Sequence, residues 1–331
     1  MTDQRAELTV PDQPTVFAVM ARASRAPSIH NTQPWRWEFD GAELRLFRDD
    51  ERRLTATDPN GRQLMISCGA MLHHARTAFA AAGWHTDVDR FPPSAHPGHL
   101  ATLTFRPWPD PPPGVRARAQ AIEQRRTDRL PLRSPSDLVT LVRTARKLAD
   151  PHDVSLAVLD ETAPERLASA AQHSTALRHY DMPYQAELRW WTGHDQSPYG
   201  VPAHALASEE EASRVPAGRV FPAGGESSRR ADLEDEAALL VLSTAGDTPY
   251  WWLHTGEAMS AVLLECAAAG LSTCPLTHIT EAPTTRQVVA NLAGREGIPQ
   301  VVIRVGVAPD TESHEPTPRR TPAEFLTMTR P

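Results

Sequence analysis

A short segment near the N-terminus concentrates side chains that can donate and accept hydrogen bonds. Residues 25–35 read Arg-Ala-Pro-Ser-Ile-His-Asn-Thr-Gln-Pro-Trp and bring together Ser28, His30, Asn31 and Gln33. A hydroxyl, an imidazole and two amides could jointly contact the polar edge of a small molecule. Asn and Ser are also common in caps and turns, so the segment taken alone fits a structural role equally well.

Arginines form two further clusters. These are Arg125, Arg126 and Arg129, with Thr127 among them, and the pair Arg319 and Arg320. Guanidinium groups match phosphate oxygens two at a time, which suits a receptor for a phosphorylated small molecule. The alternative is a solvated basic surface, since every basic residue except Lys147 is an arginine.

The composition excludes several classes of protein. Lys147, the only lysine, lies in Arg-Lys-Leu, which excludes a P-loop and argues against Schiff-base chemistry. A formal charge of -7 over 331 residues argues against partners such as nucleic acid or an anionic membrane. The cysteines form no C-x-x-C pair and the histidines complete no ligand set, so we expect no metal site and a reduced compartment. The polar start, MTDQRAELTV, together with the short apolar runs predicts a cytoplasmic protein.

Hydrophobic periodicity predicts the elements that must position these side chains. The first part of the chain reads as a helix over 14–25, a hairpin over 35–39 and 43–47 with an Asp-Gly turn, a long helix over 61–82 and a strand over 100–105. The second part predicts helices over 115–124, 136–149, 163–176 and 249–269, and strands over 154–159, 237–243 and 300–305.

The two longest predicted helices carry an internal repeat. Residues 69–83 read GAMLHHARTAFAAAG and residues 256–270 read GEAMSAVLLECAAAG, and each is followed by a loop with proline and an apolar strand. The shared order of helix, loop and strand favours duplication and two related α+β halves. The proline-rich segment 106–114 is the best boundary and predicts halves over 14–108 and 109–331.

A stretch over about 194–230 is rich in Gly, Pro, Ser and charge and is too long for an ordinary connection. It reads either as a floppy insertion or as a lid over a pocket. Four aromatic residues could form the apolar underside of such a lid, namely Trp190, Trp191, Tyr199 and Phe221.

Together these segments resemble the nitroreductase superfamily of flavin proteins, and within it the Acg-type family. APSIHNTQPW resembles the superfamily's S-x-x-N-x-Q-P-W loop, and RRTDRLPL resembles its R-R-S-x-R-x-F phosphate segment. AAAGLSTCPLTH is similar to the helix-Gly-loop segment beside the flavin ring, and RRTPAEFL to the C-terminal arm. The resemblance implies an α+β nitroreductase-like fold duplicated in one chain as a pseudo-dimer, with antiparallel-rich central sheets packed by long helices and a lid insertion.

The resemblance also implies an FMN site between the two halves. One half would bring Ser28, His30, Asn31 and Gln33 toward the flavin, and the other would bring Arg125, Arg126, Thr127 and Arg129 to the phosphate and ribityl chain. Arg319 and Arg320 match the arm that completes the phosphate site, and Pro275, Leu276, Thr277 and His278 match a loop at the N5 edge of the ring. We therefore expect the double replacement of Arg126 and Arg320 by alanine to strip the flavin.

Each site motif occurs once along the chain, which predicts a single flavin site and a monomer or homodimer. The expected partners are a small organic substrate and, as a candidate electron donor, NAD(P)H. Two further readings stay open, an FMN-sequestering protein whose lid prevents turnover and a protein that binds another phosphorylated metabolite. No residue stands out as the catalytic acid or base.

Overall fold

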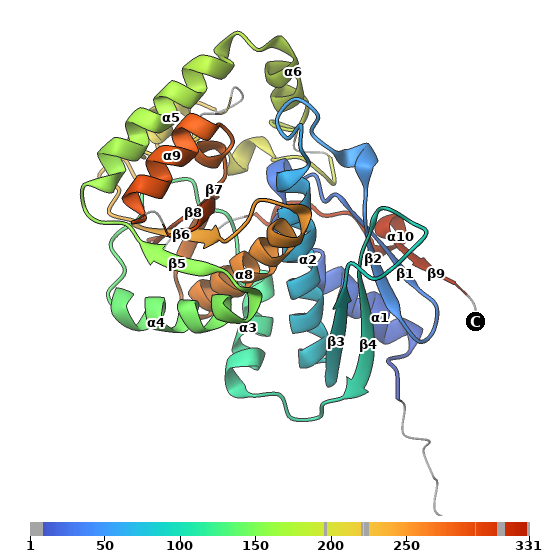
Figure 1. The fold of residues 1–331 in the computed structure, drawn as a ribbon. Helices are drawn as coiled ribbons and strands as arrows, with labels where there is room; N and C mark the ends of the chain where they lie inside the picture. The colour runs from blue at the N-terminus through green and yellow to red at the C-terminus, as the bar shows by residue number, and fades with distance from the viewer. Residues whose placement is uncertain are drawn as a thin grey trace, which may run out of the picture.

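The strands of the described residues form two sheets on either side of a pair of long helices (Figure 1). The computed structural model describes residues 9–329 except 195–196, 220, 222–224, 295 and 310–314. The helices are α1 (Gln13–Ala23), α2 (Arg62–Ala81), α3 (Pro113–Gln124), α4 (Leu138–Ala149), α5 (Ala163–His179), α6 (Met182–Trp190), α7 (Glu209–Ser213), α8 (Pro249–Ala268), α9 (Pro283–Leu292) and α10 (Pro322–Phe325). The strands are β1 (Trp35–Phe39), β2 (Leu44–Arg48), β3 (Trp84–Arg90), β4 (His99–Pro107), β5 (Ser155–Val158), β6 (Ala238–Thr244), β7 (Ser272–Leu276), β8 (Ile298–Gly306) and β9 (Leu326–Met328).

The two sheets repeat one topology. The first has the order β3-β4-β2-β1-β9 and the second the order β5-β6-β8-β7. In each, a strand leads into a long helix and then into two strands that pair antiparallel with each other, and the second of these also pairs antiparallel with the first strand, giving β2-α2-β3-β4 and β6-α8-β7-β8. The α+β architecture with antiparallel-rich sheets and long central helices is confirmed, and the repeated order extends the match seen in the sequence.

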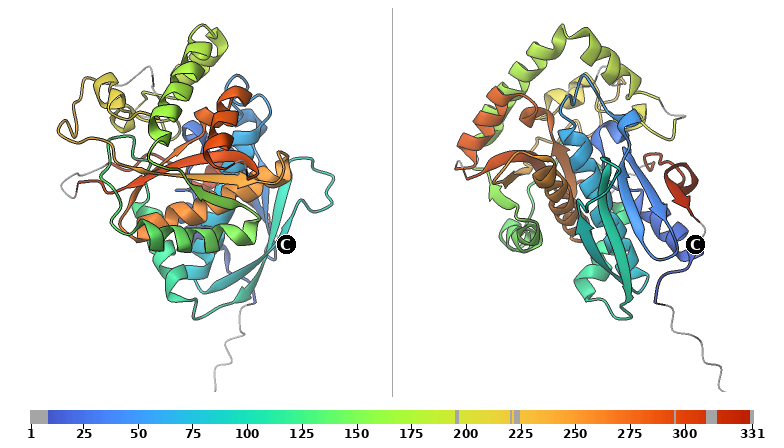
Figure 2. Two further views of the ribbon diagram at one scale, coloured as in Figure 1. Left: turned by 60° about the vertical axis from the view of Figure 1, so that its left-hand side comes forward. Right: turned by 45° about the vertical axis from the view of Figure 1, so that its right-hand side comes forward.

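Helices α2 and α8 cross at two glycines. A Cβ atom added to Gly256 would lie 2.0 Å from the carbonyl oxygen of Ile66, and one added to Gly69 would lie 2.0 Å from that of Leu253. The two backbones can approach this closely only where neither helix carries a side chain. Since both helices are covered on nearly every side, they form the centre of the molecule, and the two views of Figure 2 show them between the sheets.

Replacing Gly256 by alanine should lower the free energy of unfolding by about 1–3 kcal/mol, because the added methyl group forces the helices apart. Urea unfolding followed by circular dichroism measures this loss. Gly98→Ala is the matched control, since its Cβ would make an ordinary contact, 3.5 Å from the Arg48 side chain. Equal urea midpoints for Gly256→Ala and the wild type would contradict the close crossing.

Most predicted elements are confirmed. The hairpin forms with Trp35 opposite Arg48 and Phe39 opposite Leu44, as the Asp40-Gly41 turn predicts. Strands β3, β7 and β9 and helices α6, α7, α9 and α10 were not predicted. The prediction of a loop at 275–278 is wrong in part, because Pro275 and Leu276 lie in β7, followed by a 3-10 turn over His278–Thr280. Strand β7 is at the edge of its sheet, where a proline without an N–H group is tolerated.

The two predicted halves are interleaved. Ala121 and Ile122 of α3 belong to the core formed around Trp35 and Trp37, although they follow the proline-rich segment 106–114. At the other end of the chain, β9 pairs in parallel with β1. Helix α3 and strand β9 of the predicted second half thus pack against the first half. The boundary at residue 108 therefore stays a prediction about ancestry and does not separate two packing units.

The described part of the 194–230 stretch is held by specific contacts. Ser208 caps α7 in a capping box with Glu211, and the buried Glu211 carboxylate accepts hydrogen bonds from the Arg229 side chain at 2.7 and 2.8 Å. Burial alone would raise the pKa of Glu211, but the contacts with Arg229 and Ser208 lower it to about 2. These contacts favour an ordered cover over a floppy insertion. Across the chain, no described helix is long and apolar enough to cross a membrane.

Candidate functional site

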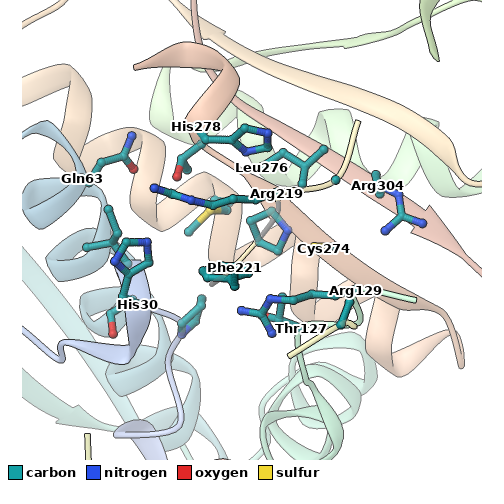
Figure 3. Close-up of a pocket in the computed structure, with 18 of the residues that line it drawn as sticks. His30, Gln63, Thr127, Arg129, Arg219, Phe221, Cys274, Leu276, His278 and Arg304 are labelled. Atoms are coloured by element: carbon teal, nitrogen blue, oxygen red, sulfur yellow. The ribbon is translucent and has the colours of Figure 1, made fainter. Parts of the chain in front are cut away.

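A cavity lies where the N-terminal loop, β7 and the 194–230 stretch meet, and we call it the central cavity. Its polar and ring-bearing lining residues are Ser28, His30, Gln63, Ser67, Thr127, Arg129, Arg219, Phe221, Cys274, Thr277, His278 and Arg304. Figure 3 shows His30 and Gln63 on one side, Thr127 and Arg129 on the other, and Phe221 between them. Of the described residues of the 194–230 stretch, Ala207, Ala212, Val215 and Gly218 also line the cavity.

The central cavity has a positive character. Among the described residues that line it none is acidic, whereas Arg129, Arg219 and Arg304 are cations. Of these, Arg304 is paired with Asp235 and Arg219 with Glu281. An electron-rich or anionic ligand therefore suits this cavity better than a cation does.

Two histidines reach the cavity with unused hydrogen-bonding atoms. Both ring nitrogens of His30 and Nε2 of His278 are buried without a hydrogen-bond partner. Burial and the nearby Arg219 lower the pKa of His278 to about 3, and burial with Arg219 and Arg129 lowers the pKa of His30. Both rings are therefore neutral at physiological pH, and each can donate one hydrogen bond and accept another.

A second hollow of about 610 Å³ adjoins the central cavity, and we call it the arginine cleft. Thr127 and Arg129 line both spaces, so the two are neighbours. The position of Thr127 is fixed because it forms a β-bridge to Thr273 at the start of β7. The arginines that line the cleft are Arg25, Arg125, Arg126, Arg129, Arg229 and Arg319.

Three of these arginines form a buried cationic cluster. Arg125 and Arg319 both direct a guanidinium group to the carbonyl oxygen of Arg25, at 3.2 and 3.3 Å. Nε and Nη1 of Arg125 and Nε of Arg25 are buried without a hydrogen-bond partner. Burial and the charge of Arg25 lower the pKa of Arg125 to about 10, and burial with the charges of Arg125 and Arg25 lowers that of Arg319.

The acidic residues that line the cleft, Glu123, Asp128 and Glu315, contact other side chains, although Glu123 also attracts Arg25. Asp128 is paired with Arg230 at 3.0 Å, and Glu123 with Arg22 at 3.1 Å. Buried charges are stable when an opposite charge accompanies them. An anion between Arg25, Arg125 and Arg319 would supply that charge, and a phosphate group offers the oxygens to do so.

The structure brings together most of the predicted site residues. Ser28, His30 and Pro275 to His278 line the central cavity, Arg125, Arg126 and Arg319 line the arginine cleft, and Thr127 and Arg129 line both. Ser28 also fixes the loop, because its Oγ accepts a hydrogen bond from the Gln33 N–H group at 2.9 Å.

Asn31, Gln33 and Arg320 line neither space. Asn31 donates to the carbonyl oxygens of Gly200 and Pro318 at 2.9 and 3.1 Å, and Gln33 donates to that of Pro198 at 2.9 Å. Arg320 donates to the carbonyl oxygens of Gln33 and Trp35 and lies 3.8 Å from Asp49. These three side chains join the loop to the C-terminal arm and to the 197–200 segment.

Of the four aromatic residues predicted beneath the lid, Phe221 lines the central cavity and the others do not. Trp190 is 68% exposed. Trp191 and Tyr199 pack on each other and against the guanidinium group of Arg52. The prediction of an aromatic underside is therefore wrong for these three residues.

Three site residues were missed by sequence reasoning. Arg25 opens the N-terminal motif and could have been identified by its position. Gln63 at the start of α2 lies in an otherwise apolar pattern and gives no signal. Arg219 is recognisable only from its partners, the carboxylate of Glu281 at 3.3 Å and the hydroxyl of Tyr184. No group of three or more potential metal ligands occurs among the described residues.

No family model matches the sequence of this chain. Among solved structures, "Crystal structure of a putative nitroreductase from anabaena variabilis" is 10% identical and superposes with a TM-score of 0.49 over 91% of this chain and 90% of that one, which is too low to support an argument. The informative matches are to proteins of Mycobacterium tuberculosis.

Two mycobacterial relatives cover nearly the whole chain. "Uncharacterized protein Rv3127" is 45% identical over 304 residues, which are 90% of this chain and 88% of the relative. "Putative NAD(P)H nitroreductase acg" is 44% identical over 300 residues, 90% of this chain and 91% of the relative. Identity at this level over matching lengths confirms the resemblance seen in the motifs, and the chain belongs to the Acg-type nitroreductase family.

Proposed function

We propose that this protein binds FMN, with the ring in the central cavity and the phosphate in the arginine cleft, and acts as an oxidoreductase on a small organic molecule. The observation that carries the proposal is the cluster of Arg25, Arg125 and Arg319, in which buried nitrogens of Arg25 and Arg125 lack hydrogen-bond partners, beside a cavity without acidic lining residues. The mycobacterial relative named as an NAD(P)H nitroreductase supports the same class of reaction and makes NAD(P)H the candidate electron donor.

The residues present fit such a cofactor. Arg25, Arg125 and Arg319 would hold the phosphate, while Thr127 and Arg129 lie where the two spaces meet and would face the ribityl chain. His30, Gln63 and His278 offer polar atoms without partners to the edges of the ring. When bound, FMN supplies two-electron transfer, as a hydride, to or from the substrate.

The protein's own contribution is binding, charge and exclusion of water. Arg129 and Arg219 place positive charge at a cavity without acidic lining residues, which favours a cofactor that gains negative charge on reduction. Val215 and Phe221 of the lid cover the cavity and keep bulk water out. His30 and His278 are neutral, so each can orient a ligand without adding charge.

We further propose that the chain carries a single flavin site. When the two repeats are aligned, Glu257, which follows Gly256, corresponds to Ala70, which follows Gly69. Arg90, seven residues after Gly83, likewise corresponds to Thr277, seven residues after Gly270. Arg90 and Glu257 form a bidentate ion pair, with distances of 2.7 and 2.8 Å, and Arg76 joins at 3.2 Å. These side chains therefore occupy the region that corresponds, in the other half of the repeat, to the central cavity. One chain, as an internal pseudo-dimer, would then bind one FMN and could act as a monomer.

An FMN-sequestering role is the second candidate. The lid residues that line the central cavity favour it, because a cover in this position hinders a dinucleotide from stacking on the ring. The two roles differ in whether electrons can enter and leave.

The visible spectrum of the flavin-loaded protein under anaerobic conditions, before and after NADPH is added, separates the two roles. We expect the flavin absorption to bleach, since the family relative is named for NAD(P)H. A spectrum that persists would favour sequestration. A protein that takes up no FMN would contradict both.

A further inference from the structure

A separate cavity of about 530 Å³ lies beside the start of α2, and we call it the side cavity. It is lined by the 57–60 turn, Arg62, Gln63, Asp247 and Trp252, by the first turns of α9, by Gly297, Ile298 and Pro299, and by Arg178 and Glu281. None of its described lining residues comes from the 194–230 lid. It therefore opens on a part of the surface that the lid does not cover.

Single side chains separate the side cavity from the central cavity. Gln63 lines both spaces, is 2% exposed, and its Nε2 has no hydrogen-bond partner. Next to it, Arg219 lines the central cavity and Glu281 lines the side cavity, and their ion pair spans 3.3 Å. A rotation of Gln63 would thus join the two spaces without any movement of the lid.

The charges of the side cavity are already matched by protein groups. Arg62 donates to Gln300 and Thr280 at distances from 2.9 to 3.1 Å, and Arg286 is paired with Asp247 at 2.6 Å. Arg178 is paired with Asp181 at 2.7 Å, and the Asp58 carboxylate accepts the Leu64 N–H group at 2.9 Å. Three arginines and three carboxylates line this space, so it carries no net charge that would attract an ionic ligand. The free amide of Gln63 can instead donate to a carbonyl or nitro oxygen.

We propose that the side cavity is the port through which uncharged small molecules with acceptor oxygens reach the cofactor, with Gln63 as the gate. This inference rests on the proposed function, since it requires a flavin in the central cavity. With such a port, exchange of a small substrate no longer depends on lid opening, whereas entry of a dinucleotide still does. A charged dinucleotide would not use this route.

Quenching of flavin fluorescence by acrylamide, a small neutral amide, tests the port in the FMN-loaded protein. Ala290 of α9 lines the side cavity, whereas Thr284 of the same helix is exposed and does not line it. The quenching constant is taken from flavin fluorescence lifetimes, because static quenching of the flavin by a new tryptophan lowers the intensity without changing the lifetime. We expect Ala290→Trp to lower this constant at least threefold, Thr284→Trp to leave it unchanged, and Gln63→Ala to raise it.

The result that overturns the port is an Ala290→Trp protein that keeps its flavin and is quenched as fast as the wild type. Quenching by iodide as fast as by acrylamide would likewise overturn selection for uncharged molecules. A wild-type protein that binds no FMN is a different outcome, because it contradicts the proposed function itself. Since Ala290 lies outside the central cavity and the arginine cleft, its variant separates these cases even if Gln63→Ala loses flavin.

Discussion

Replacing Arg125 by methionine should weaken FMN binding by about 10- to 100-fold, because a charge-assisted hydrogen bond to a buried anion is worth about 1.5–3 kcal/mol. Arg125 is buried, and two of its three side-chain nitrogens have no partner within the protein. Methionine keeps most of the side chain's volume and removes its charge. Titration of the apoprotein with FMN, followed by flavin fluorescence, measures the dissociation constant. Arg125→Met with Arg319→Met should weaken binding further, by about 100- to 10,000-fold.

The same substitution should not lower the stability of the apoprotein. Arg25, Arg125 and Arg319 repel one another when no anion lies between them, so Arg125→Met should leave the urea midpoint of the apoprotein unchanged or raised. A loss of affinity caused by misfolding would lower it. Arg126→Ala is the control, because the Arg126 guanidinium group is 38% exposed and lies 3.6 Å from Asp128, where solvent screens its charge. The structure thus moves the expected phosphate contacts from Arg126 and Arg320, the pair chosen from the sequence, to Arg125 and Arg319. Equal losses for Arg125→Met and Arg126→Ala would contradict the cluster as the phosphate site.

Replacing Glu257 by alanine should lower the free energy of unfolding by about 3–5 kcal/mol, because it leaves buried cations without their counter-charge. Glu257 lies between the two halves, fully buried, and its carboxylate binds Arg90 and Arg76 and lies 3.8 Å from His152. Urea unfolding measures the loss. Glu265→Ala on the same helix is the control, since its pair with Arg118 is partly exposed and should contribute about 1 kcal/mol or less.

The contribution of Glu257 should vanish in acid. Burial would raise the pKa of this carboxyl group, but Arg90, His152 and Arg76 lower it to about 2, below its ordinary value of 4.5. A lowered pKa stabilises the folded state above the ordinary value, and that stability is lost as the pH falls from 4.5 toward 2. The gap in unfolding free energy between the wild type and Glu257→Gln should therefore narrow by about 1.4 kcal/mol per pH unit in this range. A gap independent of pH would contradict a charged Glu257.

Local patterns in the sequence predicted the elements and their order. The alternation around Asp40-Gly41 predicted the hairpin, and the repeat of 69–83 in 256–270 identified the two central helices, although their crossing at Gly69 and Gly256 is seen only in the structure. Strand β7 was missed because Pro275 reads as a loop residue unless its place at the edge of a sheet is known. These properties depend on neighbours along the chain, which the sequence displays directly.

The motifs likewise located the site, but they did not distinguish roles within it. Arg319 and Arg320 are adjacent and look alike, yet Arg319 joins the cationic cluster while Arg320 binds the carbonyl oxygens of Gln33 and Trp35. Asn31 and Gln33 match the family loop, yet their amides hold backbone atoms of the 198–200 segment and the arm.

The tertiary structure decided which charges are compensated. Glu257 meets Arg90 across 167 residues of sequence, and Arg219 meets Glu281 across 62, whereas the Arg125 side chain meets the carbonyl oxygen of Arg25 across 100. The free energy of a buried charge depends on the groups within a few ångströms of it, and sequence spacing does not reveal those groups. The sequence by itself thus determined the family and the residues gathered at the site. The packing of distant segments determined which arginines are left to bind an anion.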